Sequence, residues 1–146
     1  MRFGMVASTV AILAGTGSSI RSRSTAPCDV VGTWELVTSR ADGNLNSLNG
    51  ARWLFIVNRS HWAQIAQRDD ARPIDLGDFG RFPVYASAGT YTVRADTFVT
   101  RTTASVMPDM RGDSLKYTCQ VTGVRWLRST HTFGMHLEEE LRRVVP

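Results

Sequence analysis

From Val31 onward, apolar and polar residues alternate along short segments that are separated by turn residues. Alternation with a period of two is typical of strands with one buried face, and the period of an amphipathic helix is hard to find here. The pattern predicts an all-β chain with eight strands, at residues 31–39, 52–57, 61–67, 88–94, 97–105, 113–121, 124–130 and 135–144. Residues 68–83, between the third and fourth strands, hold prolines, glycines and acids. We expect them to form an irregular loop over the mouth of the domain.

Eight antiparallel strands joined mostly by short turns can close into an up-and-down barrel, which removes the exposed edges of an open sheet. A barrel of this size has room for a side-chain core and one small ligand. The alternative architecture is an open sandwich of two sheets. A length of 146 residues fits a single domain, which we place at residues 28–146.

The composition is that of a globular protein, with 42% hydrophobic and 21% charged residues. No apolar run approaches the ~20 residues of a membrane span. The net charge is +4, and every basic side chain except Lys116 is an arginine. Because these arginines are dispersed rather than clustered, we expect a solvated basic surface and no nucleic-acid partner.

The N-terminus has the layout of a secretory signal peptide. Arg2 is followed by a mostly apolar or small stretch at residues 3–14 and by small residues at 15–19. We therefore interpret residues 1–27 as a signal peptide, or alternatively as a disordered tail. The first interpretation predicts an exported protein, periplasmic or secreted.

The two cysteines, Cys28 and Cys119, agree with export, because an even count in an exported protein suggests a disulfide. In an up-and-down barrel, the first strand starts at the end where the sixth strand finishes. Cys28 lies just before the first strand and Cys119 near the end of the sixth, so the two can meet there. The alternative is two unrelated buried thiols.

Several segments carry a family resemblance. They are Gly32-Thr33-Trp34-Glu35-Leu36, Trp62-Ala63-Gln64-Ile65, Ala88-Gly89-Thr90-Tyr91-Thr92-Val93 and Glu139-Glu140-Leu141-Arg142-Arg143-Val144. With them, the chain resembles the bacterial lipocalin-like domain proteins of the calycin group over residues 31–144. The chain departs from that pattern at Leu141, where the family often has tryptophan, and at Thr100-Arg101-Thr102, where relatives often have an acid. The resemblance implies a lipocalin-like barrel and leaves the ligand unassigned, since a fold does not determine a function.

The resemblance also implies structural roles for Trp34 and Arg143. In lipocalins, a first-strand tryptophan packs inside the closed end of the barrel and an arginine near the C-terminus covers it. A guanidinium on an indole contributes roughly 0.5–2 kcal/mol, depending on solvation.

The inner faces of the expected strands would line a ligand pocket that is mostly apolar, with a few hydroxyl and amide groups, as ligand sites usually are. The candidate ligand-binding residues are Trp62, Gln64, Tyr91, Phe98, Thr100, Thr102 and Tyr117. The alternative is a core filled by side chains, with no usable cavity.

Catalysis has little support in the sequence. His61, His131 and His136 lie on different strands or turns, and no nucleophile elbow, phosphate-binding loop or metal motif is present. We therefore predict no catalytic residue, no metal and no cofactor. The first hypothesis is a carrier or sensor of a small apolar or amphipathic molecule. The alternatives are a cyclase or isomerase that acts by confining a small hydrophobic substrate, and an envelope protein with structural contacts only.

Overall fold

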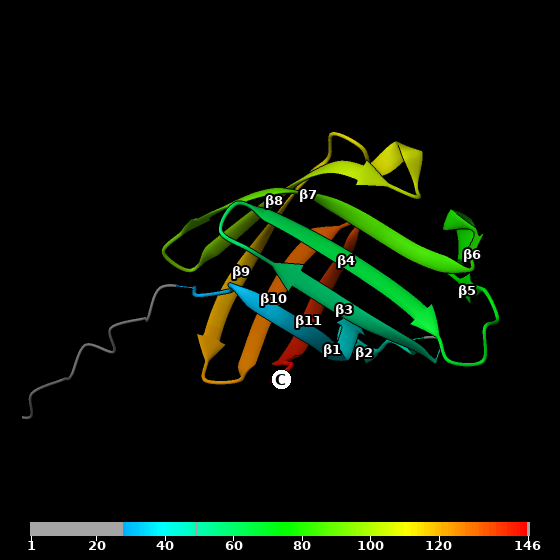
Figure 1. The fold of residues 1–146 in the computed structure, drawn as a ribbon, viewed down its shortest axis with the longest axis horizontal. Coiled ribbons are helices and arrows are strands. Elements are labelled where there is room, and N and C mark those ends of the chain that lie inside the picture. Colours follow the sequence, from blue (N-terminus) through cyan, green and yellow to red (C-terminus); the bar gives the residue numbers. More distant parts are fainter. Residues whose placement is uncertain (1–27, 49, 146) are drawn as a thin grey trace, which may run out of the picture.

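The computed structural model describes residues 28–48 and 50–145, which form a closed β-barrel (Figure 1). The barrel strands are β1 (Gly32–Ala41), β3 (Ala51–Val57), β4 (His61–Arg68), β7 (Val84–Arg94), β8 (Thr97–Ser105), β9 (Ser114–Thr122), β10 (Arg125–Thr132) and β11 (Met135–Arg143). The shorter elements are β2 (Asn44–Leu45), β5 (Ile74–Asp75), β6 (Arg81–Phe82) and the 3₁₀ turns η1 (Gly77–Phe79) and η2 (Pro108–Met110).

The eight long strands follow one another around the barrel, and each pairs antiparallel with its neighbours in the order β11-β10-β9-β8-β7-β4-β3-β1. The last strand returns to the first, with Leu36 opposite Leu141, and this pairing closes the sheet. The prediction of an all-β, eight-stranded, up-and-down barrel is confirmed, and the open sandwich is wrong. The fourth predicted strand begins earlier than expected, because β7 starts at Val84.

The segment between β4 and β7 is irregular, as predicted, but it is not without structure. It contains the small β5–β6 hairpin, in which Ile74 pairs with Phe82, and the single turn η1. No helix in the described part of the chain is long and apolar enough to cross a membrane.

Two bulges bend the barrel. In β1, the pairing with β11 shifts register between Leu36 and Thr38, so that Ser39 is buried where simple alternation would point Thr38 inward. In β7, the pairing with β8 shifts at Gly89. A Cβ atom at Gly89 would lie 1.8 Å from the carbonyl oxygen of Arg101, so only glycine allows this approach of the two backbones.

One end of the barrel, which we call the closed end, carries the turns at residues 58–60, 95–96 and 123–124. The chain just before β1 enters the barrel here, and Val30 is buried. The carbonyl of Val30 accepts a hydrogen bond from the indole nitrogen of Trp34 at 2.7 Å. Trp34 is 0% exposed and packs edge-on against Trp126, with ring centroids 5.4 Å apart. The incoming chain and the aromatic side chains together plug this end.

Arg143 covers Trp34 from outside, with its guanidinium carbon 4.2 Å from the ring centroid. It also donates a hydrogen bond from Nη1 to the carbonyl of Val31 at 2.6 Å. Gly32 has a φ of +142°, and a Cβ atom there would lie 2.5 Å from Arg143 Nη1. The Gly-x-Trp pattern therefore has a physical cause, because the arginine that covers the indole needs the space beside Gly32.

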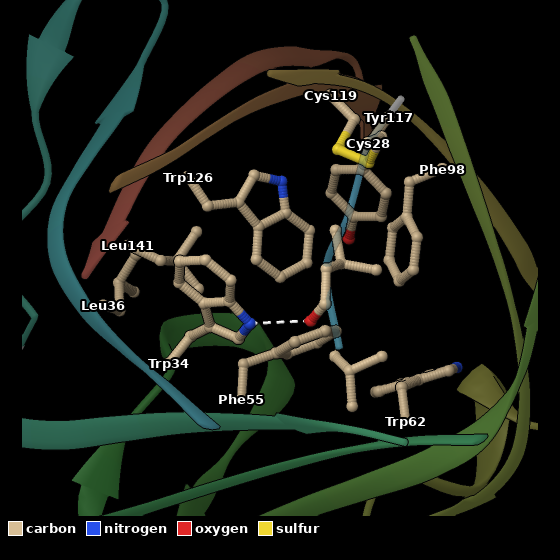
Figure 2. Packing of buried hydrophobic residues seen from close by; sticks show 12 residues of the cluster. Cys28, Trp34, Leu36, Phe55, Trp62, Phe98, Tyr117, Cys119, Trp126 and Leu141 are labelled. Atoms are coloured by element: carbon tan, nitrogen blue, oxygen red, sulfur yellow. Dashed lines mark hydrogen bonds between the residues drawn. A yellow bond between two sulfur atoms is a disulfide. The ribbon is translucent and has the colours of Figure 1, made fainter. Parts of the chain in front are cut away.

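Cys28 and Cys119 form a disulfide across the closed end, with their Cα atoms 5.8 Å apart (Figure 2). The predicted bridge is confirmed, and the alternative of two free thiols is wrong. The bridge fixes the chain just before β1 to the end of β9. The predicted signal peptide, residues 1–27, lies outside the described residues.

Candidate ligand cavity

The opposite end, which we call the open end, carries the connections from β1 to β3, from β4 to β7, from β8 to β9 and from β10 to β11. The first three are longer than any turn at the closed end, and the last is a turn of two residues. A cavity of about 400 Å³ lies inside this half of the barrel. Its apolar lining consists mainly of aromatic and methionine side chains, among them Trp53, Phe79, Tyr85, Met107, Met110 and Phe133. Its polar lining includes Ser39, Gln64, Asp75, Thr132 and Glu139. A mostly apolar hollow with a few polar groups is the usual composition of a small-molecule site.

The segment between β4 and β7 forms one side of the cavity mouth. Ile74 is 0% exposed and anchors this segment in a small core that includes Ala66 and Tyr85. From the same segment, Phe79 reaches across the mouth to Phe133 in the β10–β11 turn, with ring centroids 4.8 Å apart. The two residues are 44% and 54% exposed, respectively. These two aromatic side chains therefore bridge the mouth and belong to neither buried core cluster.

Asp75 holds the tip of this segment. Its carboxylate accepts a hydrogen bond from the backbone N–H of Gly77 at 2.9 Å and another from Arg81 Nε at 2.8 Å. These two interactions, the Gly77 N–H first, lower the pKa of Asp75 below its usual value. The carboxylate stays charged down to acid pH and keeps the η1 turn in place.

A buried ion pair joins two neighbouring strands on the inner face of the barrel. Arg128 Nε donates to Glu139 Oε2 at 2.6 Å, from directly opposite positions on β10 and β11. The side chains are 2% and 9% exposed, respectively, so this is a buried pair. The guanidinium also lies over the rings of Phe55, Tyr117 and Trp126, at 4.4, 4.8 and 5.1 Å from their centroids. Arg128 therefore packs against the aromatic cluster at the closed end, whereas Glu139 lines the cavity.

A row of buried hydroxyl groups lies beside the cavity. The Tyr85 hydroxyl is 3.2 Å from Ser87 Oγ, which donates to Ser105 Oγ at 3.0 Å. The backbone N–H of Met107 donates to the same Ser105 oxygen at 3.0 Å. Burial raises the pKa of Tyr85, so its hydroxyl remains protonated well above neutral pH. The row satisfies these polar groups and fixes the ring of Tyr85 in the cavity wall.

The residues that the sequence proposed for ligand binding divide between the two halves of the barrel. Gln64 lines the cavity. Trp62, Phe98 and Tyr117 belong to the aromatic cluster at the closed end, where Phe98 is 0% exposed (Figure 2). All four side chains point inward, as alternation predicted.

The other three candidates, Thr100, Thr102 and Tyr91, do not line the cavity. Thr100 and Thr102 are buried and point inward but are not part of the cavity lining. Tyr91 packs against the aromatic cluster, and its hydroxyl donates to the carbonyl of Asn58 in a turn at the closed end. Tyr91 therefore lies at the closed end and is not part of the cavity lining that includes Gln64.

The histidines do not meet at one site. His131 and His136 stack at 4.6 Å across the β10–β11 pair, whereas His61 is near Ser60 at the closed end. Within residues 28–48 and 50–145, no group of three or more His, Cys, Asp or Glu residues could hold a metal ion.

A larger hollow, of about 1150 Å³, lies on the outer face of β9, β10, β11 and β1. Its side chains are mostly hydroxyl-bearing or charged. They include the hydrogen-bonded pair Thr118 and Ser129 and the ion pair between Arg125 and Glu140. The Arg125 guanidinium lowers the pKa of Glu140. We interpret this hollow as a solvated outer surface, since charged and hydroxyl-bearing side chains dominate its lining.

The barrel has a solved structural neighbour. The chain is similar to the crystal structure of an uncharacterized protein from Bacteroides eggerthii DSM 20697, with a TM-score of 0.52 and 10% sequence identity. The match covers 80% of this chain and 100% of the other. No protein-family model matches the chain, and no curated protein matches it in sequence. At this identity the likeness concerns the fold alone.

Sequence reasoning missed the ion pair and most of the cavity lining. Alternation along β11 does place Glu139 on the same face as Leu137 and Leu141, so an inward-facing carboxylate was detectable. Alternation along β10 places Arg128 beside the buried Trp126 in the same way. A charged residue at an inward position of each neighbouring strand is the signal that could have found the pair.

Proposed function

We propose that this protein is a carrier or sensor that holds a small apolar or amphipathic molecule in the open half of its barrel. The observation that carries the proposal is the cavity of about 400 Å³, because ligand pockets commonly measure about 300–1,000 Å³. Its aromatic and methionine lining suits an apolar guest, since methionine adapts to irregular shapes. The Phe79–Phe133 contact would act as the gate.

We further propose a lipocalin-like ancestry and an exported location. The ancestry is supported by the Gly32-x-Trp34 start and by Arg143 over the indole. Export is supported by the Cys28–Cys119 bridge, because disulfides persist mainly in oxidising compartments.

The experiment uses N-phenyl-1-naphthylamine, an uncharged probe that fluoresces in apolar surroundings. We expect the wild-type protein to bind it saturably at one site. Gln64→Phe, which narrows the cavity and removes an amide from its wall, should weaken this binding markedly. The matched control is Gln67→Phe on the same strand, because Gln67 is exposed on the outer face of the barrel.

Both variants should retain the wild-type circular dichroism spectrum. Weaker binding by Gln64→Phe alone would support the cavity as the site. Equal binding by both variants, or no binding by the wild type, would contradict the proposed function.

A further inference from the structure

The cavity is acidic inside a basic protein. The chain has 17 basic and 13 acidic residues, yet none of the described residues that line the cavity is Arg, Lys or His. Two lining residues carry carboxylates, Asp75 at the mouth and Glu139 inside. Asp75 is paired with Arg81, which does not line the cavity, so a ligand that enters the barrel meets carboxylate oxygens and no cation among the lining residues.

The orientation of the buried ion pair explains this asymmetry. Arg128 packs over the rings of Phe55, Tyr117 and Trp126, which belong to the aromatic cluster at the closed end, and it does not line the cavity. Its Nη1 atom is buried and has no hydrogen-bond partner in the described part of the chain. Glu139 lies between this guanidinium and the hollow, so the cavity presents the carboxylate rather than the cation.

This arrangement discriminates between ligand head groups. A carboxylate entering the cavity could reach Arg128 only by displacing Glu139 or an aromatic ring, and it would first lie beside a like charge in surroundings of low polarity. A hydroxyl or ammonium group would instead donate a hydrogen bond to Glu139. Trp53 and Tyr85 also line the cavity, and aromatic rings attract an ammonium group.

We infer that the cavity takes an amphipathic molecule whose polar end donates hydrogen bonds, a hydroxyl or an ammonium group, and that it rejects carboxylates. This inference rests on the proposed function and specifies its ligand class. The charge of Glu139, held in place by Arg128, is the determinant of specificity.

The test compares three probes with the same chain and different heads: 1-octanol, octylamine and octanoate. Each competes with N-phenyl-1-naphthylamine for wild-type protein at neutral pH. Since a like-charge contact costs several kcal/mol, we expect octanol or octylamine to displace the probe at a concentration at least about tenfold lower than octanoate. Displacement by octylamine alone would identify an ammonium ligand, and displacement by octanol alone a hydroxyl ligand.

Two double variants then locate the cause. Arg128→Met with Glu139→Leu removes the inner pair and should bring the three probes within about threefold of one another. Arg125→Met with Glu140→Leu removes an exposed ion pair from the same two strands and should leave the wild-type preference unchanged. If the inner double variant fails to fold, Glu139→Gln, which keeps the shape and loses the charge, should strengthen octanoate binding.

The outcomes separate the two proposals. Octanoate binding as tightly as the other probes, or failure of all three to compete with a bound naphthylamine, would overturn the inference and leave the carrier function standing. A preference that survives loss of the inner pair would also overturn it. Failure of the wild type to bind the naphthylamine and all three octyl probes would overturn the carrier function as well.

Discussion

Removing one partner of the Arg128–Glu139 pair should destabilise the barrel in a way that depends on which partner is lost. In Arg128→Met, the carboxylate remains buried without its counter-charge. Two charges about 4 Å apart attract by roughly 4 kcal/mol at an effective dielectric constant of about 20. The carboxylate can limit this loss by taking up a proton. For a glutamate of ordinary acidity, this costs about 3.7 kcal/mol near pH 7 and only about 1 kcal/mol near pH 5.

The destabilisation by Arg128→Met should therefore be about 3–4 kcal/mol near pH 7 and shrink towards about 1 kcal/mol near pH 5. The sign follows from proton binding: the folded variant holds a proton that its unfolded chain releases, so its relative stability falls as the pH rises. Glu139→Leu should behave differently. An arginine stays charged throughout this range, so the deficit should not change with pH. The aromatic rings around Arg128 should also reduce the destabilisation by Glu139→Leu by about 1 kcal/mol or more, because they still stabilise the guanidinium.

The assay is urea unfolding followed by circular dichroism, with each variant compared with wild type at the same pH so that the titration of all other groups cancels. The double variant, Arg128→Met with Glu139→Leu, should be nearly as stable as wild type, because apolar side chains of similar volume replace a buried pair at little net cost. A deficit of Arg128→Met that is equal at both pH values would refute the reasoning. So would a double variant as unstable as either single one.

Three further predictions concern the frame of the barrel. Replacing both Cys28 and Cys119 by alanine should lower the free energy of unfolding by up to ~4.6 kcal/mol, because the bridge joins residues 91 apart; an unchanged urea midpoint would contradict this. Gly89→Ala should cost several kcal/mol or prevent folding, because its Cβ would collide with the Arg101 carbonyl, and a melting temperature near that of wild type would show that the strands can separate there. Burial raises the pKa of Tyr117 to about 12, so the folded protein should lose stability as the pH rises from about 10 through 12. Tyr117→Phe should weaken this pH dependence in urea unfolding at alkaline pH, and an identical dependence in variant and wild type would contradict it.

The alternating pattern of this chain determined much of its architecture, because strand alternation is a local property. It was sufficient to predict the eight strands, their antiparallel order and the side chains that face inward. It also predicted that Cys28 and Cys119 lie near each other, because the number of strands between them determines at which end of the barrel each cysteine lies. The family resemblance predicted the roles of Trp34 and Arg143. In the structure, Arg143 covers the Trp34 ring where the first strand pairs with the last.

Which inward side chains face a hollow was decided by the tertiary structure. The incoming chain at Val30 and the large rings fill the closed half, so Phe98 and Tyr117 became core while Gln64 became cavity wall. The bulge after Leu36 turned Ser39 inward, and no local pattern announces a bulge. The cavity mouth, the Phe79–Phe133 contact and the orientation of the Arg128–Glu139 pair arise where loops and strands distant in the sequence meet. They depend on three-dimensional packing, which periodicity along one strand does not encode.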